Sequence, residues 1–462
     1  MSETDTNAKD QTKFEHNLVK GSVVKQILIF AIPFIISNFI QSLYSVADMI
    51  IIGQFCGTES MAGVNIGGQV NFLMTNMVFG ICSGATVLIG QYLGKGARKE
   101  LNETIATLFT FLIYAAVILS SLMLIFRKFI LNLIQTPIES YDEAMIYLVI
   151  TTFGTFVIFG YNAFSAVMRG MGDSKRPLIF VSIACVTNII LDLIFVAVFG
   201  WKAAGAAIAT VISQALSMGL CITFFRKNNF VFDFKLKSFK IFPGLFKTLM
   251  KIGVPTSIQN IITSISFMMM TTMVNMLGVT SSAAVGAVGK FNSFAILPSI
   301  AVSASIAAMS AQNIGAGEFE RAKKVMKAGL TLAVCISSVM FIITQVFPAQ
   351  IMSIFDRNII KEGTEYIRMF SFDYLIVPLY FSINGLFIGA GHTFLSLIIS
   401  VTASIIIRVP VAFLFGVGFN MGLSGIGLGA PCASLGALTI AFIFYLSGKW
   451  KKSTILNISY LE

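Results

Sequence analysis

Histidine, tryptophan and charged residues are all scarce in this sequence. Of the 462 residues, two are histidines, two are tryptophans and 11% are charged. His16 and His392 are too few imidazoles for a histidine-based acid–base or metal centre. A chain of this length with so few charges cannot cover a soluble globule with polar surface. The composition therefore excludes an ordinary soluble domain and argues against histidine-based enzyme chemistry.

The cysteines and glycine-rich strings also lack the patterns that mark chemistry. The six cysteines form no CxxC pair and fall mostly inside apolar runs, so we expect packing residues rather than disulfides or metal ligands. The strings Gly94-Lys95-Gly96 and Gly315-Ala316-Gly317 lack the GK[ST] ending of a phosphate-binding loop. We therefore predict no enzyme activity, no cofactor and no resident metal. Any uphill transport would draw on an ion gradient or on a separate motor subunit.

Long apolar runs are what the sequence has in abundance. Hydrophobic residues make up 56% of the chain, and the mean hydropathy is +0.86. About twelve runs are near or beyond the roughly 20 residues that cross a bilayer, and none alternates as barrel strands do. The sequence therefore predicts an all-α integral membrane protein with twelve transmembrane helices. The runs are roughly 23–53, 61–89, 101–126, 143–168, 177–199, 203–225, 246–276, 283–311, 325–347, 365–390, 394–416 and 422–447.

The chain is an internal duplication with a shift of about 220 residues. Pro33 aligns with Pro255, and the string that starts at Gln91 aligns with the string that starts at Gln312. Such repeats are typical of transporters with a site between two halves, so we expect two pseudo-symmetric six-helix lobes around a central cavity. The predicted divisions are an N-terminal tail (1–22), an N-lobe (23–225), a linker (226–245), a C-lobe (246–447) and a C-terminal tail (448–462).

Lysine and arginine set the expected orientation. Most of the 32 basic residues fall in the tails, in the loops after even-numbered helices, and at the helix ends beside them. By the positive-inside rule both termini are cytoplasmic, and we expect a multi-pass protein of the cell (plasma) membrane. The net charge of +11 then reflects topology and contact with the lipid bilayer, not binding of nucleic acid. The polar N-terminal tail lacks the order of regions found in a signal peptide.

Acidic side chains inside the apolar runs distinguish the two lobes. Asp48 lies in the first run and aligns with Met270, so one lobe alone has this carboxylate. Asn188 and Asp192 are four residues apart on one helical face, and Thr210 follows in the next run. Two carboxylates in an apolar pocket cannot both ionise cheaply, so the cluster is a candidate site for H⁺ or Na⁺. These side chains could instead be hydrogen-bonded packing groups.

The second lobe carries a carboxylate and a guanidinium in its own apolar runs. Asp373 and Arg408 could neutralise each other as a structural pair, and Arg408 could act as a gate. Asp373 could also contact a cationic substrate. Polar side chains of the first and seventh runs are further candidates for a substrate cavity. The cavity candidates are Asn38, Gln41, Tyr44, Gln259, Asn260 and Asp373.

Four motifs carry a resemblance to a known family. They are Pro33 with Asp48, the Gly-Gln-Tyr-Leu-Gly turn at 90–94, the loop 169–173 and the segment 188–192. Together these motifs resemble the MATE (multidrug and toxic compound extrusion) antiporters, over about residues 18–450. The patterns of the first and fifth helices are similar to the bacterial MepA-like and DinF-like branches. The resemblance implies a monomer with two six-helix lobes that exports cationic or amphipathic small molecules in exchange for H⁺ or Na⁺.

The resemblance also implies a coupling site. In proton-coupled members two aspartates, an asparagine and a threonine of the N-lobe bind the ion. The NorM-like branch adds a C-lobe glutamate that works with an aspartate of the tenth helix; here Thr263 stands at the first position and Asp373 at the second. H⁺ and Na⁺ both stay open. The matching N-lobe positions are Asp48, Asp192, Asn188 and Thr210.

Two other functions compete with drug export. A lipid-linked glycan or lipid flippase of the same superfamily would share the helices, although its cavity usually needs basic side chains for pyrophosphate, and the first lobe offers acids. A channel or scaffold without coupling would show no uphill transport, and nothing in the repeats indicates a selectivity filter.

Overall fold

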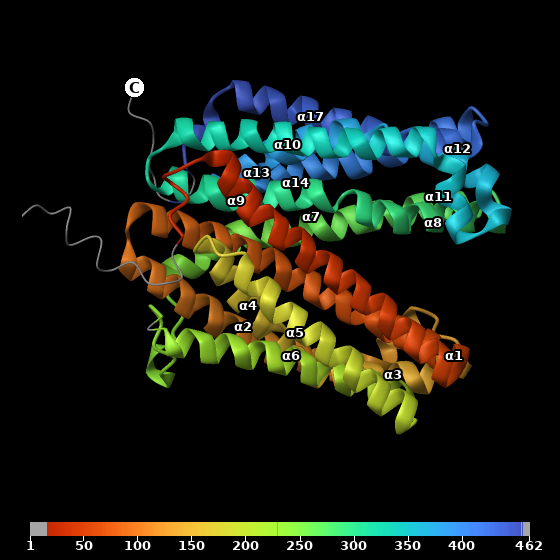
Figure 1. Cartoon of the computed structure of the whole chain (residues 1–462), viewed down its shortest axis with the longest axis horizontal. Coiled ribbons are helices and arrows are strands. Elements are labelled where there is room, and N and C mark those ends of the chain that lie inside the picture. The colour runs from red at the N-terminus through yellow and green to blue at the C-terminus, as the bar shows by residue number, and fades with distance from the viewer. Residues whose placement is uncertain (1–15, 229, 454, 456–462) are drawn as a thin grey trace, which may run out of the picture. The chain divides into compact units, whose positions relative to one another are not determined.

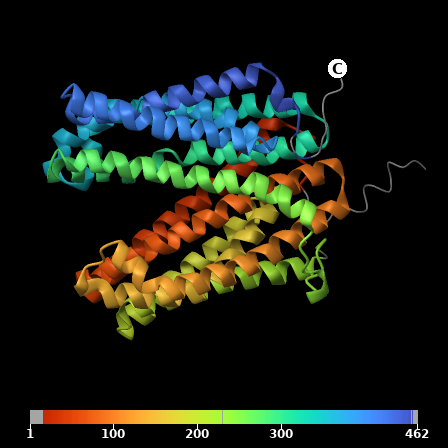
Figure 2. The same cartoon turned by 180° about the vertical axis from the view of Figure 1, so that it is seen from behind.

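The computed structural model describes residues 16–228, 230–453 and 455. Over these ranges the regular secondary structure is helical throughout, without a strand. The all-α prediction is confirmed. The chain packs as two compact units, each described here by itself (Figures 1 and 2). Unit 1 contains residues 36–89 and 97–250, and unit 2 contains residues 18–35, 90–96 and those from 251 onwards.

The first two predicted runs fall within α1 (Val23–Lys95), in which two helices join across a kink. Its single interior break is at Gly57, where φ is +80°, a conformation that favours glycine. The remaining helices of unit 1 follow in chain order. They are α2 (Arg98–Leu133), α3 (Ile138–Phe153), α4 (Thr155–Gly170), α5 (Lys175–Asp192), the π-helix η1 (Leu193–Val198), α6 (Lys202–Lys227) and the short η2 (Leu236–Ser238).

Unit 2 begins its main run of helices within α7 (Pro243–Asn275), whose first residues belong to unit 1. Two π-helices interrupt its last third. The elements after α7 are α8 (Val279–Ala295), α9 (Leu297–Gly315), α10 (Phe319–Val346), α11 (Pro348–Phe355), η3 (Arg357–Ile359), α12 (Ile360–Phe370), α13 (Asp373–Gly389), α14 (Thr393–Val401), η4 (Thr402–Arg408), α15 (Val409–Phe413), η5 (Leu414–Gly418), α16 (Gly422–Gly427), α17 (Gly429–Leu446) and η6 (Lys449–Lys451).

The helices are long and apolar enough to make a multi-pass membrane protein. Eight stretches qualify as spans in the described residues, and the bent pairs α3–α4 (52°) and α12–α13 (41°) bring the number to ten. The 73 residues of α1 hold two spans on either side of Gly57, and α7 has 33 residues. Counting α1 as two spans brings ten to eleven, and α7 lies where the sequence predicts the seventh of its twelve transmembrane segments.

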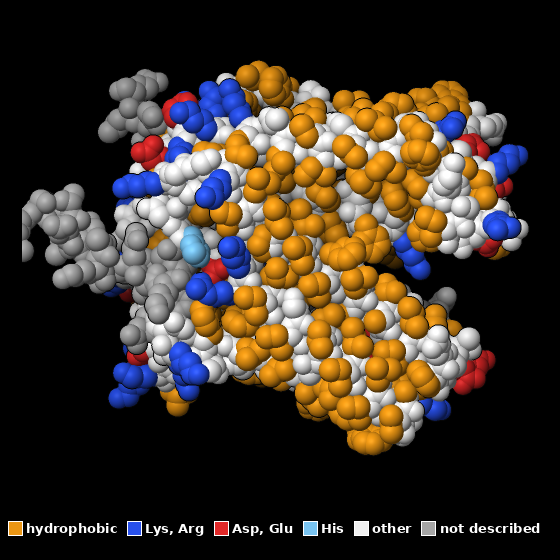
Figure 3. Space-filling view, viewed as in Figure 1, with side chains coloured by type: hydrophobic (Ala, Val, Ile, Leu, Met, Phe, Trp, Pro, Cys, Tyr) orange, Lys and Arg blue, Asp and Glu red, His pale blue; other side chains and the backbone are white. Residues whose placement is uncertain are grey.

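The surfaces of the units fit a bilayer. On the face shown in Figure 3, hydrophobic side chains cover much of the flanks of the helices, and the Lys and Arg side chains gather near helix ends. Large apolar side chains stand out from the flanks, such as Phe72 at 63% exposure and Ile125 at 70% in unit 1 and Ile443 at 64% in unit 2. In water such surfaces would be costly, whereas lipid tails solvate them.

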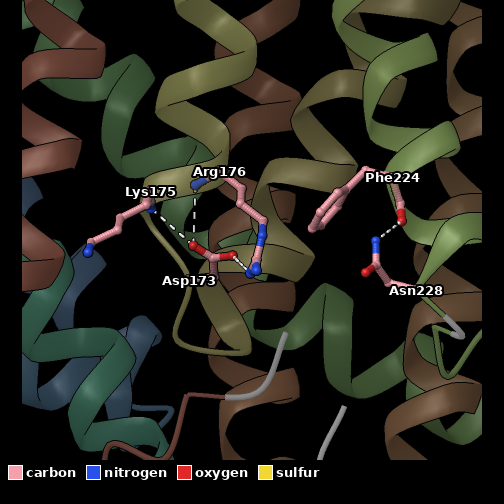
Figure 4. Close-up of polar contacts among 5 residues, drawn as sticks. All are labelled: Asp173, Lys175, Arg176, Phe224 and Asn228. Carbon is pink, nitrogen blue, oxygen red and sulfur yellow. Dashed lines mark hydrogen bonds and ion pairs between the residues drawn. The ribbon is translucent and has the colours of Figure 1, made fainter. Parts of the chain in front are cut away.

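A polar cap sets the start of α5, the helix that carries Asn188 and Asp192. Asp173 Oδ1 accepts hydrogen bonds from the backbone nitrogens of Lys175 (3.0 Å) and Arg176 (3.2 Å), and its second oxygen pairs with the Arg176 guanidinium (Figure 4). The guanidinium carbon lies 4.7 Å from the ring centroid of Phe224 on α6. These contacts tie the N-terminus of α5 to α6.

The duplication is visible in local backbone structure. In η1, the carbonyl group of Phe195 packs against Gly205, and in η5 the carbonyl group of Phe415 packs in the same way against Gly425. A Cβ on either glycine would meet the backbone of its phenylalanine. A shift of 220 positions takes Phe195 to Phe415 and Gly205 to Gly425, so these elements are equivalent in the two units.

Unit 2 has one additional residue just before this point. Gly172 and Gly391, both with positive φ, are related by a shift of 219, whereas Phe195 and Phe415 are related by 220. The interval in unit 2 contains a π-helix, η4, where α5 is an ordinary α-helix in unit 1. A π-helix accommodates an extra residue because its hydrogen bonds span five residues instead of four.

In unit 2 the duplicated segments that start at Gln91 and Gln312 pack against each other, with the glycine of each on the backbone of the other. Gly94, near the end of α1, packs on the carbonyl group of Gln312, and Gly315, the last residue of α9, packs on the carbonyl group of Gln91. The side chain of Gln91 donates to the Gly389 carbonyl oxygen (2.7 Å). The two helix ends therefore touch backbone to backbone, which requires glycine at both positions.

Candidate functional site

The four residues predicted to bind the coupling ion come together inside unit 1. Asp48 of α1, Asn188 and Asp192 of α5, and Thr210 of α6 are buried, with exposures of 7%, 1%, 0% and 6%. The carboxyl groups of Asp48 and Asp192 lie side by side, within reach of a hydrogen bond that forms when one of them is protonated. Their role in ion binding stays a prediction.

Local structure explains why these side chains meet. Asn188 and Asp192 are one helical turn apart, so both face the same side of α5. The α-helix ends at Asp192, and the π-helix η1 starts at the next residue. The thiol of Cys185, a turn before Asn188, lies 3.9 Å from the carbonyl oxygen of Ile40, where α1 passes α5. Such π-segments often occur where a helix must present side chains to a site.

Most polar atoms of this cluster have no hydrogen-bond partner among the described residues. They are Asp48 Oδ1, both side-chain polar atoms of Asn188, both carboxyl oxygens of Asp192 and Thr210 Oγ1. Buried polar atoms are normally paired, because an unpaired one loses its hydration without compensation. Carboxylate, amide and hydroxyl oxygens are donors suited to a hard cation, and a carboxylate also accepts a proton. Such a set of side chains can bind a proton or a small cation.

Two tyrosines complete the cluster. Tyr44, predicted as a cavity residue, lies beside Asp48 and Asp192. Tyr147 of α3 has its hydroxyl group next to Thr210 and also lies near Asp48. Sequence reasoning missed Tyr147. The duplication offers a signal for it, since a shift of 219 takes Tyr147 to Tyr366, another buried tyrosine.

Tyr147→Phe is expected to weaken ion-driven transport about fivefold without unfolding the protein. The ring stays buried and the cluster loses one hydroxyl group, and one hydrogen bond that this group makes when the ion is bound corresponds to about 1 kcal/mol. Dye uptake into proteoliposomes under an imposed ion gradient measures the effect. Tyr141→Phe, on the same helix, is the matched control and should behave as wild type. Equal driven uptake in both variants would remove Tyr147 from the site.

Comparison with known proteins identifies the family. The family model described as MatE matches residues 33–194 and 255–414, which is more than half of the chain. The chain belongs to the MATE family. The probable multidrug resistance protein YoeA of Bacillus subtilis (strain 168) is 30% identical over 448 residues, covering 95% of this chain and 96% of that protein. The probable multidrug resistance protein NorM of Thermotoga maritima is 27% identical over 449 residues, covering 94% of each.

A solved structure shows the same fold. It is described as the outward-facing conformation of a multidrug resistance MATE family transporter of the MOP superfamily. The TM-score is 0.89 at 21% identity, over 96% of this chain and all of that one. The predicted resemblance to MATE transporters is thus confirmed, and so is the twelve-helix class. The chain is a multi-pass membrane protein of a multidrug efflux family.

The other cavity candidates of this MATE protein are divided between the units. Asn38 and Gln41 lie on α1 in unit 1, where Asn38 is half-buried and Gln41 exposed. Gln259 and Asn260 are half-buried on α7 in unit 2. Asp373, the remaining candidate, is buried. Their contact with a substrate stays a prediction.

The two charges predicted in the second half of the MATE chain are neighbours in unit 2. Asp373 is the first residue of α13 and Arg408 the last residue of η4, with exposures of 5% and 9%. They lie within reach of each other's charge, but they form no direct ion pair in the described structure. The guanidinium carbon of Arg408 lies 4.6 Å from the ring centroid of Phe267.

Proposed function

We propose that this MATE protein is a secondary active exporter that moves cationic or amphipathic small molecules out of the cell in exchange for H⁺ or Na⁺. The coupling ion binds at Asp48, Asn188, Asp192 and Thr210, and no other cofactor takes part. The protein acts as a monomer in the plasma membrane with both termini cytoplasmic. The observation that carries the proposal is the set of buried oxygens in unit 1 without hydrogen-bond partners.

Ion capture changes the charge inside unit 1. With the site empty, Asp48 and Asp192 are adjacent carboxyl groups in an apolar interior, and negative charge there is costly. An incoming H⁺ or Na⁺ removes that cost and alters the packing of α1 around Asp48. Pro33, inside the same helix, removes a backbone hydrogen bond and makes α1 easier to bend. Ion binding thereby favours one conformation of the transporter over the other.

The free energy of a proton gradient is enough to drive a modest accumulation of a drug on one side of the membrane. One proton that moves down 100 mV releases about 2.3 kcal/mol, and one pH unit adds about 1.4 kcal/mol. When a monovalent cation leaves for each proton, the voltage term cancels and about tenfold accumulation remains. Two carboxyl groups in the site allow a second proton, which restores the voltage term.

Separately imposed gradients test the proposal. In inverted membrane vesicles we expect uptake of ethidium, a cationic dye, to follow either the proton or the sodium gradient. Asp48→Asn should abolish this dependence, because an amide takes up no proton and has no negative charge to attract Na⁺. The control is Asp142→Asn, an exposed carboxylate of α3, which should behave as wild type. Gradient-driven uptake in Asp48→Asn at wild-type protein level would refute the coupling role.

A further inference from the structure

Unit 2 contains an altered copy of the ion site. A shift of 220 positions, the one that superposes Phe195 on Phe415, takes Asn188 to Arg408. The other members of the unit 1 site correspond to apolar residues that share one buried cluster with Tyr366, the counterpart of Tyr147. Asp192 pairs with Ala412 and Thr210 with Ala430 by the same shift, and Asp48 pairs with Met270 by the shift of 222 that takes Pro33 to Pro255.

The π-helix η4 sets the register of Arg408. The extra residue of unit 2 lies between Gly391 and Phe415, and η4 ends at Arg408. Arg408 lies seven positions before Phe415, as Asn188 lies seven positions before Phe195. Arg408 therefore occupies the position in unit 2 that Asn188, the amide residue of the site, occupies in unit 1.

The surroundings of Arg408 resemble an ion site that is already filled. Its guanidinium lies over the face of Phe267 and near Asp373 and Tyr366. A buried carboxylate needs a positive partner, and a guanidinium keeps its charge at any physiological pH. Asp373 Oδ1 and the Nε and Nη1 atoms of Arg408 have no hydrogen-bond partner in the described residues. Arg408 thus supplies charge to Asp373 without a close ion pair.

We propose that Arg408 is a built-in cation that takes, in unit 2, the role that the exchangeable ion takes in unit 1. The inference rests on the proposed function. Unit 2 consequently has no exchangeable ion, although Asp373 is a carboxylate in its interior, and unit 1 alone sets the number of ions exchanged per substrate. Arg408 is in this sense a residue that determines coupling stoichiometry.

Ion counting on purified protein tests the inference. Bound ²²Na⁺ and bound protons are measured for wild type, Arg408→Asn, Arg408→Lys and Asp373→Asn/Arg408→Asn. Arg408→Asn leaves Asp373 beside an amide, as in unit 1, so we expect one more equivalent of bound ion than in wild type. Arg408→Lys and the double variant should return to the wild-type number. An unchanged number in folded Arg408→Asn, or an extra ion that persists in the double variant, would overturn the inference.

A second variant covers the case in which Arg408→Asn does not fold. Asp373→Asn should bind as many ions as wild type but unfold at a lower temperature, because it leaves a lone buried cation. Loss of a bound ion in Asp373→Asn would overturn the inference, since Asp373 would then be an ion ligand itself. Asp48→Asn is measured in parallel. The number of ions bound by Arg408→Asn is compared with the number bound by wild type. A difference of one ion can therefore be measured even if unit 1 binds no ion and the proposed function is wrong.

Discussion

Asp192→Asn is expected to abolish gradient-driven export while leaving the protein folded and at least as stable as wild type. Asp192 is fully buried, and neither of its carboxyl oxygens has a hydrogen-bond partner in the described structure. Asparagine has nearly the same shape, carries no charge and takes up no proton. Drug accumulation should fall from at least about tenfold, at a gradient of one pH unit, to none.

Stability separates a coupling role from a structural one. If Asp192 served to hold helices together, replacing it would remove favourable contacts and lower the unfolding temperature. If it captures an ion, the wild-type carboxylate is a cost to the folded state that asparagine removes. Thermal unfolding of purified protein and driven ethidium uptake are measured on the same preparations. A large drop in unfolding temperature together with retained coupling would contradict the assignment.

The ion cluster was predictable because its charged and polar side chains lie within apolar runs of the sequence. A carboxylate such as Asp48 inside a run of apolar residues stands out in a sequence without any structure. Asn188 and Asp192 were predictable as neighbours because helical periodicity puts positions four apart on one face. Tyr147 does not stand out in the same way, since a tyrosine with a mostly apolar ring is ordinary in a membrane helix.

The π-helices were harder to predict than the other helices. Hydropathy ended the first run near residue 53 and began the second near 61, and the kink at Gly57 that separates the two helices of α1 lies in that interval. A run of apolar residues has the same hydropathy in an α-helix and in a π-helix. The register change at η4 becomes visible in the sequence only as a change in the repeat shift from 219 to 220, once the structure shows where to count.

Substitution of Gly94 or Gly315 by alanine is expected to destabilise unit 2 by about 3 kcal/mol or more. A Cβ on Gly94 would meet the Gln312 carbonyl oxygen, and a Cβ on Gly315 would meet that of Gln91, both at well under 3.0 Å. Because the opposing atoms belong to backbone, no side chain can turn away to relieve the overlap, and the two helices must separate. The unfolding temperature of each purified variant measures the effect.

A glycine of the same helix without close neighbours provides the control. Gly68 of α1 has no atom within 4 Å of the position of a Cβ, so Gly68→Ala should leave stability unchanged or raise it by about 0.5–1 kcal/mol through helix propensity. Gly94→Ala and Gly315→Ala force apart the same pair of helices, so their combined cost should be less than the sum of the single costs. Full additivity would mean that the two glycines do not share one contact.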